Sequence, residues 1–394
     1  MISLPSKEHC TGCGACAFIC SRNCIVMEED SMGVILPVID SSNCVECNRC
    51  MSVCPILSAC KLHAPEKVFA ARSLDSFTET HSASGGLASE LYRDAIRSGW
   101  SIVGAAQQDD FSVRLELTND LTATERFRNS KYIFSTAYKL YPDIQKLLKG
   151  KGKAMVIGLP CQIAAIRKVF RDTPDLFYVD IVCHGTTPHR YLLQHVRNIE
   201  KRESKKAFEV SFRDPAFGTG TFTFSVKDKD GNTFYSKRTK DGDTYQYAYH
   251  RWISYRENCY HCPFARKERV GDISLADYPG LGRHIPFPYR RGNISCVLVN
   301  TNRGAAMIKQ LIQQNSVFAV ERPVEEAIAG NGQLRRPTSK TKKRFAFEKT
   351  MQRNACDFEK AVRPLMVKGL LGERIRGISR LPLRVVRKIL KSVR

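Results

Sequence analysis

The chain has 394 residues, which leaves room for two or three domains and for a sizeable buried core. Its net charge of +23 is concentrated at one end, because the segment from Arg335 onwards holds 19 Lys and Arg against 4 Asp and Glu. No recognised nucleic-acid-binding module accompanies this charge, so nucleic acid is not favoured as a partner. No run approaches the ~18 apolar residues of a membrane-spanning helix, and no apolar leader precedes Cys10. We therefore expect a soluble, cytoplasmic protein.

The 16 cysteines are spaced as metal ligands rather than as disulfide partners, which also indicates a reducing compartment. Eight of them form two runs, Cys10-x2-Cys13-x2-Cys16-x3-Cys20 and Cys44-x2-Cys47-x2-Cys50-x3-Cys54-Pro55. This is the spacing of bacterial two-cluster ferredoxins, in which the fourth cysteine of each run ligates the other cluster. The runs predict one 4Fe-4S cluster on Cys10, Cys13, Cys16 and Cys54, and a second on Cys44, Cys47, Cys50 and Cys20. Zinc would use two C-x2-C pairs and leave the third cysteine of each run without a role.

Residues 1–60 form this ferredoxin-like module, with a short strand expected at 33–40 and with Cys24 and Cys60 outside the pattern. From Val68 onwards strands and helices alternate, which is typical of an α/β domain with a partly parallel sheet. Strands are expected at 68–72, 100–105, 113–117, 154–157, 177–182, 273–276 and 294–300. Helices are expected at 84–98, 137–148, 162–170, 189–200, 243–256, 303–313 and 324–328. Residues 207–238 instead predict an antiparallel meander, with Asp230-Gly231 as a hairpin turn.

Four further cysteines lie where a predicted strand ends or a turn begins: Cys161, Cys183, Cys259 and Cys262. Ligands in open α/β sheets bind at the carboxyl ends of strands, and a C-x2-C pair with two single cysteines can complete a four-thiolate site. The spacing favours a third iron–sulfur cluster, with zinc or unrelated thiols as the alternatives. Cys296 and Cys356 are interpreted as structural.

Two glycine-containing turns are candidate cofactor contacts. The first, Ser84-Gly85-Gly86, opens a helix, where unpaired N–H groups can bind a phosphate or a flavin; such a turn also commonly caps a helix without any ligand. The second runs from Gly158 to Gln162 and is ambiguous by itself. His184 is a candidate proton carrier, although a lone histidine is more often structural.

Taken together, these motifs resemble one family, the β subunit of the deazaflavin (coenzyme F-420) dependent hydrogenases and formate dehydrogenases. The resemblance rests on the cysteine-rich N-terminus, Ser84–Gly86, and four motifs in order: Gly158-Leu159-Pro160-Cys161-Gln162, Asp180-Ile181-Val182-Cys183-His184-Gly185, Cys259-Tyr260-His261-Cys262 and Gly271-Asp272-Ile273-Ser274-Leu275-Ala276-Asp277-Tyr278. It covers about residues 1–330. Leu159 departs from the family's usual threonine but leaves the cysteine in place.

The resemblance implies a flavoprotein with FAD in the α/β domain, and it favours the third 4Fe-4S cluster on Cys161, Cys183, Cys259 and Cys262. Ser84, Gly85, Gly86, Gly158, Gln162 and His184 are then the predicted flavin contacts. The fold class is α+β: a dicluster ferredoxin module (1–60), an α/β flavin-binding domain with a mixed sheet (67–150 and 151–330), and a basic helical C-terminal tail (331–394). Use of the deazaflavin does not follow from this fold.

The predicted function is an iron–sulfur flavin oxidoreductase that passes electrons between 4Fe-4S clusters and FAD, to or from an unidentified substrate. Its partner would be a redox protein or a small electron donor, and relatives in bacterial surface-polysaccharide pathways suggest that setting. The alternative is a polyferredoxin-type electron-transfer subunit without a substrate site. Residues 383–393 predict a basic amphipathic helix suited to an anionic surface, such as the inner face of a membrane, or else a terminal helix packed on the body.

Overall fold

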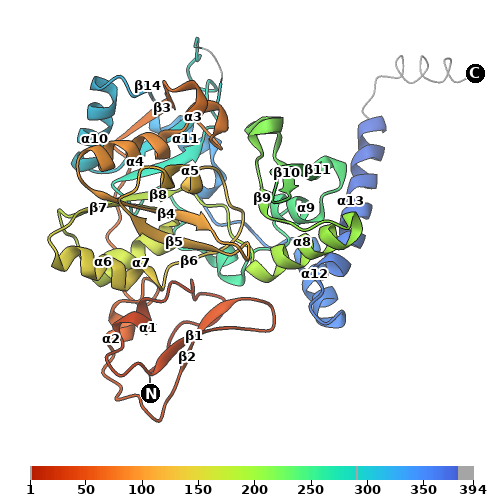
Figure 1. Cartoon of the computed structure of the whole chain (residues 1–394), viewed down its shortest axis with the longest axis horizontal. Coiled ribbons are helices and arrows are strands. Elements are labelled where there is room, and N and C mark those ends of the chain that lie inside the picture. Colours follow the sequence, from red (N-terminus) through yellow and green to blue (C-terminus); the bar gives the residue numbers. More distant parts are fainter. Residues whose placement is uncertain (1, 290–291, 380–394) are drawn as a thin grey trace, which may run out of the picture.

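The computed structural model describes residues 2–289 and 292–379. The N-terminal module contains two short helices, α1 (Ala15–Ile19) and α2 (Arg49–Ser52), and an antiparallel hairpin of β1 (Ile25–Glu29) and β2 (Ile35–Ile39). The strand predicted at 33–40 is confirmed as β2, whereas β1 was not predicted. The module lies at one end of the molecule, with α1 against α6 (Leu140–Lys149) and α7 (Pro160–Phe170) (Figure 1).

A nine-stranded mixed sheet forms the centre, in the order β14-β3-β13-β12-β8-β7-β4-β5-β6. Its strands are β3 (Lys67–Ser73), β4 (Ser101–Gln107), β5 (Val113–Thr118), β6 (Ser135–Thr136), β7 (Ala154–Gly158), β8 (Leu176–Ile181), β12 (Ile273–Asp277), β13 (Ser295–Val299) and β14 (Val317–Arg322). The middle strands β4, β7, β8 and β12 run parallel to one another. β7 and β8 are buried along almost their whole length, which is typical of parallel strands covered on both faces. The predicted mixed sheet is therefore confirmed.

Helices cover both faces of this sheet. One layer contains α4 (Leu87–Arg97) and α10 (Asn302–Gln313), whose apolar side chains pack on β3 and β13, and the other contains α6 and α7, which pack on β7 and β8. Shorter helices complete the domain: α3 (Ser76–His81), α5 (Ala123–Phe127) and α11 (Val324–Gly330).

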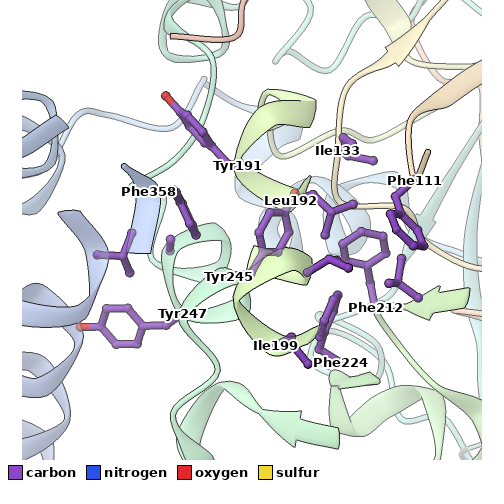
Figure 2. Close-up of a cluster of buried hydrophobic side chains, with 14 of the residues drawn as sticks. Phe111, Ile133, Tyr191, Leu192, Ile199, Phe212, Phe224, Tyr245, Tyr247 and Phe358 are labelled. Carbon is purple, nitrogen blue, oxygen red and sulfur yellow. The ribbon is translucent and has the colours of Figure 1, made fainter. Parts of the chain in front are cut away.

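A second unit stands beside the sheet and combines a small meander with four helices (Figure 1). Its elements are α8 (His189–Glu203), β9 (Glu209–Ser211), β10 (Thr223–Lys227), β11 (Thr233–Arg238), α9 (Thr244–His250), α12 (Lys342–Arg353) and α13 (Phe358–Ser379). Figure 2 shows the core they share, with Tyr191 and Leu192 from α8, Phe224 from β10, and Tyr245 from α9 facing Phe358. The meander predicted at 207–238 is confirmed.

The first part of the region assigned to the basic tail belongs to this core. Phe347 of α12 and Phe358 of α13 are fully buried in the shared cluster. Burying each phenylalanine stabilises the fold by about 1.5–3 kcal/mol, so both helices are integral to the second unit. The amphipathic helix predicted at 383–393 lies outside the described residues. No helix in the described ranges combines the length and the apolar character needed to cross a membrane.

A buried histidine joins three helices of this unit. His195 of α8 places Nε2 3.0 Å from Oδ2 of Asp243, at the start of α9, and Nδ1 2.5 Å from Oε1 of Glu359 in α13. Burial alone would lower the pKa of His195, but the two carboxylates outweigh it and raise the pKa to about 9. The imidazolium therefore holds α13 against the rest of the unit at neutral pH.

The predicted helix over 243–256 is wrong in its second half. α9 ends at His250, and Trp252 takes a left-handed backbone with φ 58°. The chain then turns into the short 3-10 helix η4 (Glu257–His261), which carries the next cysteine pair. A helix continued to residue 256 would carry this pair past the edge of the sheet.

Candidate metal centre

Four cysteines of the N-terminal module are buried close together: Cys10, Cys13, Cys16 and Cys54. Burial raises the pKa of the first three thiols, and every pair among the four is near enough for one thiolate to raise the pKa of another. Backbone N–H groups of Gly12, Ala15 and Ala17 point at the sulfurs of these three cysteines and lower the pKa of each thiol, against the effect of burial. Such N–H groups stabilise ligand thiolates. The structure thus brings together the first predicted ligand set.

The second predicted set is Cys20, Cys44, Cys47 and Cys50. Burial raises the pKa of Cys50, with smaller contributions from Cys47 and Cys20. Cys24, which the spacing left unassigned, lies among them with its Sγ 3.4 Å from Sγ of Cys20. That contact, together with Cys44, raises the pKa of Cys24 to about 11.

The third set forms at the edge of the sheet. Cys161 lies in the first turn of α7 shortly after β7, Cys183 follows β8, Cys259 lies in η4 and Cys262 directly follows η4. Since β7 and β8 are parallel neighbours, their carboxyl ends lie at the same edge. Burial raises the pKa of Cys161, Cys183 and Cys262, and all six pairs of the four thiols interact electrostatically. Cys161 and Cys262 are therefore neighbours, although 101 positions separate them in the sequence.

A buried ion pair fixes the two chain segments that carry this set. Asp180, at the end of β8, accepts hydrogen bonds from Arg269 Nε at 3.1 Å and from the backbone N–H of Gly271 at 2.8 Å. Both charged side chains are almost completely buried. Arg269 also donates to the carbonyl of Phe264, two residues after Cys262, at 3.1 Å. The pair therefore holds the loop after Cys262 against the strand that leads to Cys183.

Gln162 and Gly185 shape the backbone beside the cysteines. The fully buried Gln162 donates to the carbonyl of Ser135 at 2.6 Å, and its Oε1 accepts from the N–H of Leu159 at 3.0 Å. Gly185 has φ +136°, and a Cβ there would stand 2.3 Å from the ring of Tyr255. Gln162 is thus a positioning residue for the turn of Cys161, and only glycine fits two residues after Cys183.

Arg256 and Tyr141 lie between the first and third cysteine sets. Arg256 lowers the pKa of both Cys10 and Cys161, and it donates two hydrogen bonds of 3.1 Å to the carbonyl of Thr11. Its guanidinium lies 3.8 Å from the centre of the Phe134 ring, and its buried Nε has no hydrogen-bond partner within the described residues. Tyr141 donates its hydroxyl to the carbonyl of Cys13 at 3.1 Å and interacts with Cys161 as well. The two sets are therefore adjacent.

The charge of Arg256 has no carboxylate beside it in the described part of the chain. A buried cation is costly unless it is paired. Iron–sulfur clusters with four thiolates are anionic, so a cluster on either set would supply the missing countercharge. The unpaired Nε and the N–H groups aimed at sulfur fit such a group.

Across residues 2–289 and 292–379, no three Cys, His, Asp or Glu side chains converge on the position of a single metal ion. A structural zinc ion brings four thiolates to about 2.3 Å from one point. The four thiolates of a 4Fe-4S cluster each ligate a different iron, so they stand farther apart. Each of the first and third sets brings four thiols near enough to interact electrostatically, as the ligands of one cluster would be.

The predicted flavin contacts lie in two places. Ser84 donates to the carbonyl of Ile294 at 2.8 Å, and the N–H of Gly85 donates to Ser295 Oγ at 2.9 Å. A Cβ on Gly85 would lie 2.4 Å from the carbonyl oxygen of Ala71, so glycine is required there by packing. Gly86 caps α4 with φ 84° and no side-chain cap.

The remaining predicted contacts belong to the third cysteine set. Gly158 packs against Gln162, and both shape the turn before α7. His184 follows Cys183 and is exposed to solvent. Crowding by surrounding protein nevertheless lowers its pKa, with an opposing effect from Asp277. Ser84, Gly85 and Gly86 therefore lie apart from Gly158, Gln162 and His184.

Residues that the sequence patterns missed lie in the turn before α4 and in the loop after α5. Ser82 Oγ and Arg128 Nε are buried without hydrogen-bond partners in the described residues. Lys131 donates to the carbonyl of Arg128 at 2.9 Å, and burial lowers its pKa to about 7. The only signal in the sequence was the run of basic residues at 126, 128 and 131, which resembles an ordinary solvated loop.

The doubled cysteine runs and the sheet-edge thiols define an iron–sulfur redox protein. Residues 9–57 match the family described as the 4Fe-4S dicluster domain, and residues 152–325 match the family described as the C terminus of the coenzyme F420 hydrogenase/dehydrogenase beta subunit. The chain thus carries an N-terminal 4Fe-4S dicluster domain and a region similar to the C terminus of this family of oxidoreductase beta subunits. It is an iron–sulfur electron-transfer protein related to those subunits.

Two individual relatives are similar to parts of the chain. A ferredoxin-like protein in the nif region of Sinorhizobium fredii is 39% identical over 59 residues, which cover 14% of this chain and 84% of the relative. The structure of the F420-reducing [NiFe] hydrogenase complex from Methanosarcina barkeri contains a chain with 18% identity. That similarity covers 68% of this chain and 86% of the other, with a TM-score of 0.44.

Proposed function

We propose that the chain is an iron–sulfur flavoprotein oxidoreductase that passes electrons between 4Fe-4S clusters and FAD, to or from a substrate of its own. The ligands would be the two N-terminal sets and a third set of Cys161, Cys183, Cys259 and Cys262. The observation that carries the proposal is the convergence of this third set beside the first, with Arg256 between them. When bound, the clusters supply one-electron transfer and a flavin joins single electrons to two-electron chemistry.

The protein would contribute insulation and charge around these groups. The ring of Phe134 covers the guanidinium of Arg256, and α1 packs directly on α6 and α7. Arg256 is almost completely buried, so its charge lies away from bulk solvent. In such a low-dielectric space a cation stabilises added negative charge more strongly than it would in water. Arg256 would therefore favour the reduced state of both sites.

Support for FAD comes from the start of α4. An uncapped helix N-terminus attracts anions such as phosphate, and α4 has no side-chain cap. Within the described residues, Ser82 Oγ in the turn before α4 and Arg128 Nε are unpaired polar atoms, and the guanidinium of Arg128 lies over Phe77 of the preceding helix α3. The N–H group of Gly86 would face the phosphate, because the Ser84 hydroxyl already donates to Ile294 and the Gly85 N–H already donates to Ser295.

Three further parts of the proposal rest on the sequence alone. They are a redox protein or small donor as partner, contact of residues 383–393 with an anionic membrane surface, and a setting in surface-polysaccharide metabolism. A peripheral position on the inner membrane face would follow from the second.

A polyferredoxin-type subunit without a substrate site is the alternative. It is favoured by the identity between the N-terminal module and a small ferredoxin-like protein. Purification without oxygen, followed by iron, sulfide and flavin determination, separates the two functions. About twelve irons with one FAD support the oxidoreductase, whereas about eight irons without flavin support the alternative. A colourless, iron-free protein would contradict both.

A further inference from the structure

A large cavity opens in the second unit, away from the cysteines. Its volume is about 860 Å³, within the range of sites that hold cofactor-sized organic molecules. The meander supplies one wall, the turn after α9 the second, and the start of α12 the third. The cavity is therefore built by segments from three distant parts of the chain.

Within the described part of the chain, the charged side chains that line the cavity are all basic: Arg238, Lys240, Arg251, Lys342 and Lys343. Arg238 is paired with Asp241 at 2.6 Å, and Lys343 donates to the hydroxyl of Tyr247 at 2.6 Å. Lys240 and Lys342 are exposed. Charged hydrogen bonds from such groups suit a phosphate or a pyrophosphate.

Two aromatic residues of the lining have an unusual backbone. Phe222 has φ 53° and Trp252 has φ 58°, both in the left-handed region that bulky side chains rarely adopt. Such a conformation costs on the order of 1–3 kcal/mol, and residues that adopt it are often found at ligand sites. Trp252 is 44% exposed. Both rings therefore lie in the lining at a conformational cost, and their faces suit a flat ring of a ligand.

His250 adds a polar group to the same wall. Its Nε2 is buried and has no hydrogen-bond partner within the described residues. Burial, aided by Arg213 and His184, lowers the pKa of His250 to about 4, so the ring is neutral at physiological pH. The wall therefore presents a neutral ring beside the basic side chains.

A layer of aromatic rings connects this wall to the third cysteine set. The ring of His250 meets the rings of Tyr132 and Tyr249 edge-on, with centroids 5.3 Å away in each case. Tyr249 donates its hydroxyl to the carbonyl of Gly185 at 3.2 Å, two residues after Cys183. The cavity is thus one aromatic layer from the proposed third cluster.

We propose that this cavity binds a small organic phosphate that carries a ring, such as a nucleoside diphosphate group, and that it is the substrate site of the oxidoreductase. The second statement rests on the proposed function. The basic residues would hold the phosphates, and Phe222 and Trp252 would hold the ring.

Calorimetric titration of the intact, anaerobically purified protein with ADP and with inorganic pyrophosphate tests the proposal. The double variant K240Q/K342Q removes two cations and should weaken ADP binding by about tenfold or more. The matched control K146Q/K149Q removes two exposed charges from α6 and should leave the affinity unchanged. ADP should bind more tightly than pyrophosphate, because only ADP offers a ring.

Absence of ADP binding at millimolar concentration would overturn the proposal. Equal affinities for ADP and pyrophosphate, or equal weakening in both double variants, would also overturn it. Iron content distinguishes these failures from failure of the proposed function, because no cysteine is among the described residues that line the cavity. If the protein has its full iron content but does not bind ADP, only the proposal for the cavity is refuted. An ADP-dependent change in the electron paramagnetic resonance (EPR) spectrum of the reduced protein, absent from K240Q/K342Q, would support the link to the third set.

Discussion

Replacing Arg256 by methionine removes a positive charge from between two cysteine sets while keeping an unbranched side chain. One guanidinium nitrogen lies 2.7 Å from the position that a Cβ of residue 12 would take, between Cys10 and Cys13. The charge is therefore near the first set, and its effect on Cys161 places it near the third as well. We expect R256M to lower the reduction potentials of both sites, because each becomes harder to reduce without the cation.

The size of the effect follows from Coulomb's law. At a separation of about 8 Å and an effective dielectric constant of about 20, one unit charge contributes ~2 kcal/mol. For a one-electron couple, where a tenfold change in the equilibrium constant is about 59 mV, this corresponds to a shift of roughly 90 mV. The variant also leaves the carbonyl of Thr11 without its donor, which costs about 1–3 kcal/mol of folding stability.

The assay is a redox titration followed by EPR, with iron content measured first to select intact protein. R256K keeps the charge and should retain potentials close to the unmodified protein. Unchanged potentials in an iron-replete R256M protein would refute the position of Arg256 between two clusters. A shift in R256K as large as in R256M would show that geometry, rather than charge, is responsible.

Two further predictions concern folding. The pKa of His195 is about 9 in the folded protein and near 6.5 in the unfolded chain. Its contribution to folding stability is therefore complete below pH 6.5 and is lost as the pH rises through 9. Over this pH range the free energy of unfolding should fall by ~3 kcal/mol in the unmodified protein, and this fall should be absent in H195Q. Urea unfolding at pH 6, 8 and 9.5 measures it. Parallel pH profiles for the two proteins would contradict the prediction. G185A should lose iron, because its Cβ would lie 2.3 Å from the ring of Tyr255. The control G231A, in an open hairpin, should lower the folding stability by about 1 kcal/mol and keep its iron. Equal iron in the two variants would refute the close approach at Gly185.

The cysteine sets were predictable because their chemistry is local or tied to strand ends. The N-terminal runs predict their clusters by spacing alone, and Cys161 and Cys183 follow strands whose apolar character identifies β7 and β8. Parallel neighbours share an edge, so strand prediction was enough to bring these two cysteines together. For Cys259 and Cys262 the spacing favoured a place in a third set and the resemblance strengthened it, although no pattern between residues 184 and 258 indicates where the chain returns.

Other features depend on tertiary contacts that leave little trace in the sequence. α12 and α13 are rich in basic residues, and Pro364 lies inside α13, so the region reads as a solvated tail. Only the burial of Phe347 and Phe358 in a distant core reveals that both helices are structural. Arg256 lies in an unremarkable segment, and the left-handed backbone of Trp252 interrupts the predicted helix without any signal in the sequence.

The most direct test of the third thiolate set is a comparison of two cysteine variants. Cys161 belongs to the set, whereas Cys296 is buried in β13 and serves as the matched control. If three clusters are present, C161S should lose about four of twelve irons and C296S none, with iron and sulfide measured on anaerobically purified protein. Full iron in C161S, or the same loss in C296S, would contradict a cluster at the edge of the sheet.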